Sequence, residues 1–326
     1  MLVSTIVPLL SLILAAAVCP GGSVVSTTCG SGWGATLQAE SGAQAPLQTS
    51  SDDQQLLEIG RAPRLQATPK TPAQFKVISY NIRWRSGEEL RKLIRLFRDD
   101  PELGGAALLG LQEVDRNKKR TGNSNTAKLL AEELGMYYAW AAPPTAKPEQ
   151  EEETGVAILS VYPLSEVRRI VLPHPGPGQR RRVALGATIE VGKTRLRFYS
   201  VHSESRMGVD RKLEQMNAVL EDLAKFPRKT AAVVLGDLNT WQRKAVKKTF
   251  QLFRAADFET PFDKRSTFCM RVLFINIPLK LDWIWLRGLE AKSYGIDRNV
   301  NISDHCPLWV VVQPKPNRAV LSKPGL

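Results

Sequence analysis

Residues 231–239, AAVVLGDLN, combine a short apolar run with two polar side chains at its end. A continuous run of small and apolar residues bounded by a turn residue indicates a strand within a sheet. Asp237 and Asn239 come directly after the run and are separated by one residue. Because side chains at positions i and i+2 of an extended segment point the same way, we expect both to face one site.

Five more apolar runs along the chain carry polar residues in the same way. They are Asn81 after 75–80, Glu113 after 106–111, His202 after 196–201, Asp282 within 280–286, and Asp304 with His305 before 308–312. In open α/β sheets, sites assemble at the carboxyl ends of the strands. The sequence therefore predicts that these groups are gathered in one site.

Helical patterns and hairpin patterns alternate with these runs. Apolar spacing and cap residues predict three helices: one capped by Ser86 and Glu89 and stopped at 99–101, one at 125–134 before Gly135, and one from about Asp210 to 226. Further strand patterns lie at 155–161, 164–172, 183–191 and 195–201, the last two joined by a tight turn at Gly192-Lys193. Hairpins mixed with helical crossovers predict an α/β fold with mixed sheets.

The amino-terminal segment differs from the rest of the chain in composition. Residues 2–18 are apolar or small, about the length of a signal-peptide core and short for a membrane span, although no Lys or Arg precedes them. We expect a signal peptide cleaved near Ala17 and a protein that is secreted, periplasmic or associated with the cell envelope. Lipidation of Cys19 and an uncleaved amino-terminal anchor, which would hold the protein at a membrane, are the alternatives.

Domain boundaries follow from the composition of the remaining segments. Residues 19–74 are rich in Gly, Ser, Ala and Pro and have little apolar periodicity, which predicts a disordered linker. We expect the ordered domain to span 75–313 and a disordered tail to span 314–326.

The four cysteines, Cys19, Cys29, Cys269 and Cys306, have no spacing typical of a zinc site. Two states are open for Cys269 and Cys306. They form a disulfide if the compartment is oxidising, or they are two buried thiols.

Charge is distributed unevenly over the 326 residues, whose formal net charge is +13. Residues 1–60 contain four acids and no Lys or Arg, so residues 61–326 carry 45 bases against 28 acids, or +17. A basic field of this size suits a phosphate-rich polymer or an anionic membrane. A solvated basic surface without a specific partner is the alternative interpretation.

Oxygen-bearing side chains provide candidates for a metal site. Carboxylate and amide oxygens are the ligands that a hard cation such as Mg²⁺ prefers. Glu113, in the segment LQEVD, and Asn81, after Ser79-Tyr80, are therefore candidate metal ligands. Asp237 is the candidate to orient or deprotonate a water molecule, and Asn239 to bind phosphate.

Asp282 lies inside an apolar strand pattern, where a carboxylate is costly unless it is paired. His305 is the expected partner, because Asp282 would fix its tautomer and stabilise its positive charge. Each polar residue taken alone also has a structural explanation, such as a turn, a helix cap or a satisfied histidine. All of them in this order form a specific pattern.

The full pattern resembles the endonuclease/exonuclease/phosphatase superfamily over roughly residues 75–313. The matching segments are Tyr80-Asn81, Gln112-Glu113, TGVAILS at 154–160, Val201-His202, GDLN at 236–239, Leu281-Asp282 and Ser303-Asp304-His305. The resemblance implies a four-layer α/β sandwich, with two mixed β-sheets packed face to face and flanked by helices. It also implies Mg²⁺- or Mn²⁺-dependent hydrolysis of phosphoester bonds.

By the same resemblance, each matching residue has an expected role. Glu113, Asn81 and Asp304 correspond to the metal site, and His305, Asp237, Asn239, His202 and Asp282 to the catalytic groups. The chain departs from the usual pattern at Gly155, Ser203 and Cys306, which are neighbours of these groups. The reaction class is therefore better defined than the substrate.

Two residues near the motifs are candidates for binding the substrate. Arg182 opens a predicted strand after Arg180-Arg181, and Trp241 follows Asn239 by two residues. With the basic field, they favour an exported nuclease that acts on nucleic acid as a monomer. A lipid or small-molecule phosphoesterase, sphingomyelinase-like or phosphoinositide phosphatase-like, is the alternative.

Overall fold

The computed structural model describes residues 55–67, 73–144, 153–262, 265–269, 271–272, 275–276 and 278–315. All of them belong to one structural unit, residues 48–326. The expected signal peptide or anchor, most of the expected linker and residues 316–326 of the expected tail lie outside the described residues.

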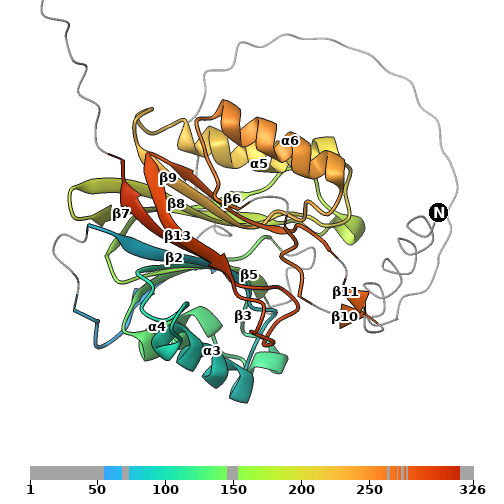
Figure 1. The fold of residues 1–326 in the computed structure, drawn as a ribbon. Helices are drawn as coiled ribbons and strands as arrows, with labels where there is room; N and C mark the ends of the chain where they lie inside the picture. Colours follow the sequence, from blue (N-terminus) through green and yellow to red (C-terminus); the bar gives the residue numbers. More distant parts are fainter. Residues whose placement is uncertain are drawn as a thin grey trace, which may run out of the picture. The chain divides into compact units, whose positions relative to one another are not determined.

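The first sheet has seven strands in the order β1-β4-β5-β3-β2-β14-β13. Its strands are β1 (Leu57–Arg61), β2 (Phe75–Asn81), β3 (Leu108–Arg116), β4 (Tyr137–Ala141), β5 (Glu153–Ser160), β13 (Leu289–Ile296) and β14 (Leu308–Pro314). β2 and β3 pair in parallel, and the other neighbours pair antiparallel. The helices α3 (Gly87–Asp99) and α4 (Thr126–Leu134) cover its outer face (Figure 1).

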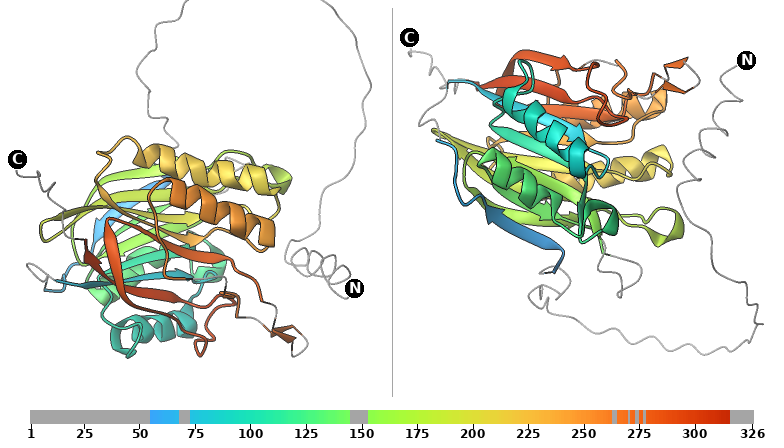
Figure 2. Two further views of the ribbon diagram at one scale, coloured as in Figure 1. Left: turned by 45° about the horizontal axis from the view of Figure 1, so that its top comes forward. Right: turned by 90° about the horizontal axis from the view of Figure 1, so that it is seen from below.

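The second sheet has five strands in the order β12-β9-β8-β7-β6. Its strands are β6 (Leu164–Val171), β7 (Val183–Val191), β8 (Thr194–His202), β9 (Ala231–Asp237) and β12 (Asp282–Arg287). β8 and β9 pair in parallel, while the other neighbours pair antiparallel. The helices α5 (Val209–Leu223) and α6 (Arg243–Ala255) lie side by side on its outer face (Figure 2). The short elements are η1 (Lys119–Thr121), η2 (Pro177–Gln179), β10 (Arg271–Val272) and β11 (Ile275–Asn276).

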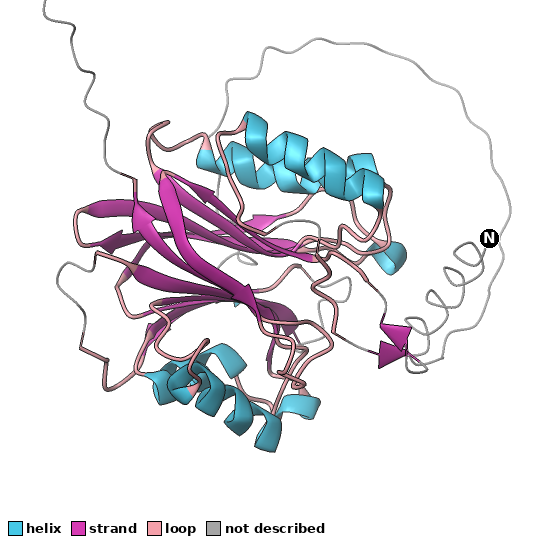
Figure 3. Ribbon diagram, viewed as in Figure 1, coloured by secondary structure: helices cyan, strands magenta, loops and turns pink. Residues whose placement is uncertain are grey.

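The two sheets pack face to face between the two pairs of helices, so the four-layer α/β sandwich is confirmed (Figure 3). At Gly110 of β3 the sheets approach so closely that an added Cβ would lie 2.1 Å from Leu235 Cδ1 of β9. A second apolar cluster fills the layer under α5 and α6, where the Trp285 ring stacks on Trp283 and on Phe253.

The helix ends show where local sequence signals were sufficient. α4 begins after Asn125, whose side chain accepts hydrogen bonds from the N–H groups of Ala127 and Lys128, and it ends at Gly135 in a left-handed conformation, as expected. α3 begins after Ser86, also as expected, but the capping-box hydrogen bond is absent. The Ser86 hydroxyl instead donates to Arg120 O, 3.1 Å away, because η1 supplies an acceptor.

The ordered domain begins at β1, upstream of Phe75, so the expected boundary at residue 74 is wrong for this segment. β1 pairs antiparallel with β4 at the edge of the first sheet. Glu58 on β1 accepts from Tyr138 (2.7 Å) and pairs with Arg116 (3.2 Å). These contacts are made with residues distant in sequence, which explains why composition alone predicted a linker.

Cys269 and Cys306 form a disulfide, with their Cα atoms 5.5 Å apart. It ties the segment before β10 to the residue after His305. Within the part of the chain that the structure describes, no helix has the length and apolar character to cross a membrane.

Candidate active site

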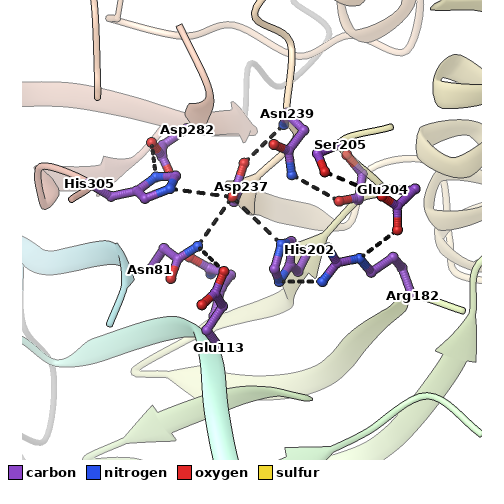
Figure 4. A network of polar contacts seen from close by, with 12 residues as sticks. Asn81, Glu113, Arg182, His202, Glu204, Ser205, Asp237, Asn239, Asp282 and His305 are labelled. Atoms are coloured by element: carbon purple, nitrogen blue, oxygen red, sulfur yellow. Dashed lines mark hydrogen bonds and ion pairs between the residues drawn. The ribbon is translucent and has the colours of Figure 1, made fainter. Parts of the chain in front are cut away.

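Strand direction brings the polar residues of the sequence motifs to one edge of the sandwich (Figure 4). Asn81 and His202 end β2 and β8, and Asp237 ends β9. β12 runs antiparallel to β9, so Asp282 at its start lies opposite Asp237. His305 precedes β14, which runs antiparallel to β2. Carboxyl ends of some strands and amino ends of others therefore meet at the same edge.

Asp237 lies at the centre of the cluster. Its Oδ2 atom accepts a hydrogen bond from Asn81 Nδ2 at 3.2 Å and lies 3.6 Å from His202 Nε2 and 3.7 Å from His305 Nε2. Burial and the negative charges of Asp282 and Glu113 raise the pKa of Asp237 to about 6, although the His305 charge opposes this. The Asp237 carboxyl thus combines burial with close polar neighbours, as a group that handles a water proton requires.

His305 is held by Asp282, as the sequence predicted. His305 Nδ1 lies 2.9 Å and 3.0 Å from the two oxygens of Asp282. Burial alone would lower the pKa of His305, but the charges of Asp282 and Asp237 and the hydrogen bond that His305 donates to Asp282 outweigh burial and raise it to about 10. His305 is therefore the cationic histidine of the site.

His202 has a different neighbour. Its Nδ1 lies 3.3 Å from Arg182 Nη1. Burial first, and then the positive charges of Arg182, Arg180 and His305, lower the pKa of His202 well below its usual value. The two histidines that flank Asp237 therefore differ in charge.

Glu113 lies in a β-bulge within β3 rather than after the strand. The pairing of β3 with β5 shifts register between Gln112 and Val114, and Glu113 has φ 55°. A residue other than glycine in this conformation costs on the order of 1–3 kcal/mol and persists where its surroundings impose it. Here Glu113 O accepts the Trp84 N–H at 2.8 Å. The bulge re-aims the Glu113 side chain toward the site.

Asn239 is held in a tight turn after β9. It has φ 52°, and its N–H donates to Asp237 Oδ1 at 3.0 Å. Its Nδ2 donates to Ser203 O at 2.9 Å. The buried Lys212 donates to Asn239 O, a contact that sequence analysis missed because Lys212 lies on a helix with an otherwise ordinary pattern.

Two groups of side chains are candidates for a metal site. Asp237, Asp282 and His305 bring ligand atoms within 4.8 Å of one another. In this group the Asp282 carboxylate and His305 Nδ1 already satisfy each other, so it works better as a proton-handling group. Glu113 fits a cation better, because its buried Oε2 has no hydrogen-bond partner among the described residues while its Oε1 accepts from Asn81 at 3.3 Å.

The neighbours of Glu113 also favour a cation. Burial first, and then the negative charges of Asp282 and Glu113, raise the pKa of Asp237, and a divalent cation beside Glu113 would offset that negative charge. Asn81 turns its amide nitrogen to Glu113 and Asp237, while its oxygen accepts the Arg83 N–H at 3.1 Å. Glu113 is thus the carboxylate that best fits a cation, and a ligand role for Asn81 stays a prediction.

Asp304 and the two expected substrate-binding residues are placed differently. Asp304 pairs with Arg83 at 3.2 Å at the edge of the cluster. Arg182 points inward to His202, whereas its neighbour Arg181 is exposed. Trp241 is 38% exposed, just beyond Asn239. The structure therefore joins Arg182 to the site and leaves Trp241 on the surface beside it.

Sequence analysis missed Glu204. Its side chain is buried and accepts from Arg182 Nε at 3.1 Å and from Arg180 Nη2 at 3.2 Å. A signal was available: the predicted hairpin at 183–201 places the arginine run beside the strand that ends at His202, and Glu204 lies two residues further on.

Comparison with known proteins agrees with this geometry. The model of the endonuclease/exonuclease/phosphatase family matches residues 78–305. No curated protein sequence matches the chain closely enough to count as a relative.

Several solved structures share the fold. An endonuclease/exonuclease/phosphatase from Beutenbergia cavernae is 16% identical with a TM-score of 0.60, covering 74% of this chain and 72% of that one. The human Nocturnin catalytic domain with bound sulfate is 19% identical with a TM-score of 0.56, covering 74% and 94%. Humanized TDP2 of D. rerio is 15% identical with a TM-score of 0.56, covering 74% and 100%. At these identities the likeness concerns the fold alone.

Proposed function

The chain belongs to the endonuclease/exonuclease/phosphatase family, and from this premise we propose that it is an exported, Mg²⁺- or Mn²⁺-dependent phosphodiesterase that cleaves nucleic acid as a monomer. Members of the family are metal-dependent phosphoric ester hydrolases, which defines the reaction class. The observation that carries the proposal is the convergence of His202, His305 and Asn81 on Asp237 beside Glu113. The basic charge of residues 61–326 favours nucleic acid as the substrate.

Each group of the site has a distinct task in phosphoester hydrolysis. Asp237 accepts a proton from the attacking water and orients it, because its carboxylate is buried and fixed by the Asn239 N–H. His305, kept positive by Asp282, donates a hydrogen bond to a phosphoryl oxygen and stabilises the negative charge that develops there. The Asn239 amide is a second donor to the phosphate.

Glu113 would hold the divalent cation, with Asn81 and Asp304 as the other expected ligands. When bound, the cation supplies Lewis-acid stabilisation of charge on the phosphate oxygens. The protein contributes the bulge at Glu113, which places in the site one carboxylate oxygen to which no residue of the described segments donates a hydrogen bond.

A substrate panel tests the proposal. Purified full chain is incubated with plasmid DNA, RNA, sphingomyelin vesicles and bis-nitrophenyl phosphate, with Mg²⁺, with Mn²⁺ and with chelator. We expect metal-dependent digestion of nucleic acid that weakens as salt rises, because the basic field steers the polymer. His305→Ala protein purified in parallel controls for contaminating nucleases.

Two results would contradict the nuclease proposal. Cleavage of sphingomyelin or bis-nitrophenyl phosphate with intact nucleic acid would make the protein a lipid or small-molecule phosphoesterase. Undiminished activity in chelator would contradict the metal requirement. Mass measurement of the mature amino terminus tests export, since an intact residue 1 contradicts signal cleavage.

A further inference from the structure

The hydrogen bond between Arg182 and His202 restricts where His202 carries its proton. Arg182 Nη1 lies 3.3 Å from His202 Nδ1. A guanidinium has five N–H donors and no acceptor. His202 Nδ1 must therefore accept, and an imidazole that accepts through Nδ1 carries its single hydrogen on Nε2.

The Nε2 atom of His202 faces the catalytic centre. It lies 3.6 Å from Asp237 Oδ2, on a side chain that is only 7% exposed. Figure 4 shows Arg182 on the side of the His202 ring opposite Asp237. The hydrogen on Nε2 therefore points at the region where Asp237 and His305 also meet.

Arg182 is itself held in place by Glu204. Arg182 Nε donates to Glu204 Oε2 at 3.1 Å, and the Glu204 side chain is fully buried. The Arg206 N–H donates to Glu204 Oε1 at 3.0 Å, and Gln215 Oε1 accepts the Glu204 N–H at 2.9 Å. Bonds to its backbone and to its carboxylate thus fix Glu204, which orients Arg182.

Close packing also favours this position of Glu204. An added Cβ at Gly176 would lie 2.6 Å from Glu204 Cδ, so the loop before η2 leaves room for the carboxylate only because residue 176 is glycine. Register explains the contact with the histidine, because Val183, the residue after Arg182, pairs with His202. The arrangement is therefore built from three separate segments of the chain.

We propose that Arg182 is a positioning residue that holds His202 as the neutral Nε2–H tautomer, so that His202 serves as a fixed hydrogen-bond donor to a phosphoryl oxygen. Glu204 supports this role by orienting Arg182. The proposal rests on the proposed phosphodiesterase function, and it divides the work between the histidines: His305 brings positive charge, and His202 brings a directed neutral donor.

Nitrogen-15 NMR of the full chain tests the tautomer without any substrate. The chain has three histidines, and the signals are assigned with His174→Gln and His202→Ala variants. At neutral pH we expect long-range proton–nitrogen correlations of His202 that show one unprotonated Nδ1 and one protonated Nε2. A doubly protonated ring, a proton on Nδ1 or averaged nitrogens would overturn the proposal.

Kinetics with bis-nitrophenyl phosphate separate positioning from substrate binding. Arg182→Met removes the donor, Arg182→Lys keeps a donor and a charge, and Arg181→Met is the matched control at the exposed neighbour. For Arg182→Met we expect kcat to fall on the order of 10-fold, which is less than the 10²–10³-fold typical of losing a donor itself. KM should change little, and the nitrogen-15 signals of His202 should show averaging of the two tautomers. Arg182→Lys should restore most of kcat, and Arg181→Met should change neither quantity.

The outcomes distinguish the two proposals. A higher KM for Arg182→Met with an unchanged His202 tautomer would overturn the positioning role. Lack of activity on every phosphoester would contradict the proposed function, while the tautomer would still be decided by NMR of the unmodified chain. If Arg182→Met does not fold, Arg182→Lys and the unmodified chain give the same decision.

Discussion

The two histidines of the site have opposite surroundings although both face one oxygen of Asp237. On one side Asp282 lies 2.9 Å from His305 Nδ1, and its negative charge helps to raise the pKa of His305. On the other side Arg182 lies 3.3 Å from His202 Nδ1, and its positive charge helps burial to lower the pKa of His202. The residue beside Nδ1 thus sets the charge of each imidazole ring, so that histidine serves two purposes within one cluster.

The largest expected effect comes from removing the cationic histidine. His305→Ala should lower kcat by at least ~10²-fold, because it removes both the charge and the donor that stabilise the phosphoryl oxygens. His202→Ala should cost less, since it removes a neutral donor only. Steady-state kinetics at saturating Mg²⁺ compares them, with His174→Ala as the control outside the cluster. Equal losses of kcat for His305→Ala and His202→Ala would contradict the different roles given to the two histidines.

A smaller effect is expected from Glu113, the carboxylate at the bulge in β3. Glu113 contacts neither Asp282 nor Arg182, the partners of the two histidines, in any hydrogen bond described above. Glu113→Gln keeps the size of the side chain but removes its charge, so the Mg²⁺ concentration for half-maximal activity should rise roughly 10–100-fold. A metal titration measures this, with Glu132→Gln on the surface of α4 as the control. An unchanged titration would remove Glu113 from the ligand set.

The next expected effect comes from the disulfide, which helps to hold His305 in position. Segment 265–269 bridges to His305 through Phe268, and Thr267 Oγ1 accepts the Asp282 N–H at 2.9 Å. The Cys269–Cys306 bond ties this segment to the residue after His305. Converting both cysteines to serine should lower kcat by a few-fold to roughly 10-fold through misplacement of His305.

The same double variant compares the two histidines. Its kcat reports the placement of His305, whereas the His202 tautomer should not change when the disulfide is absent. NMR and kinetics of the double variant provide both readings. Full activity of the double variant, or of reduced unmodified protein, would show that the disulfide does not position His305.

The smallest expected effect concerns the free energy of unfolding contributed by Glu204, which holds Arg182 beside His202. Burial would raise the pKa of Glu204, but Arg182, the Arg206 N–H and Arg180 lower it to about 2, from 4.5. A lowered acid pKa stabilises the folded state above pH 4.5, and this contribution is lost as the pH falls toward 2. Unmodified protein should therefore lose on the order of 1–3 kcal/mol more unfolding free energy than Glu204→Gln over this range.

Urea unfolding at pH 5 and at lower pH values measures that difference. Glu190→Gln, at an exposed position of β7, is the matched control. Parallel pH curves for Glu204→Gln and unmodified protein would show that Glu204 is not held by the arginines in solution.

Much of the fold was predictable because its signals are local. The apolar runs before Asn81, His202 and Asp237 became β2, β8 and β9, and Asn125 and Gly135 delimit α4 as expected. β1 was not predictable, because Glu58 and its strand are ordered by Arg116, Tyr138 and the edge of β4. An edge strand is stabilised by its partner, and the partner lies far away in sequence.

The sequence by itself determined which atoms are available for the chemistry: the acids, amides and imidazoles at the ends of apolar runs, the pairing of Asp282 with His305, and the family. Only the tertiary structure decided that Glu113 lies in a bulge, that Arg182 rather than Arg181 turns inward, and that Glu204 holds it. The physical reason is that side-chain charge depends on neighbours within a few ångströms, and strand pairing, not sequence order, chooses those neighbours.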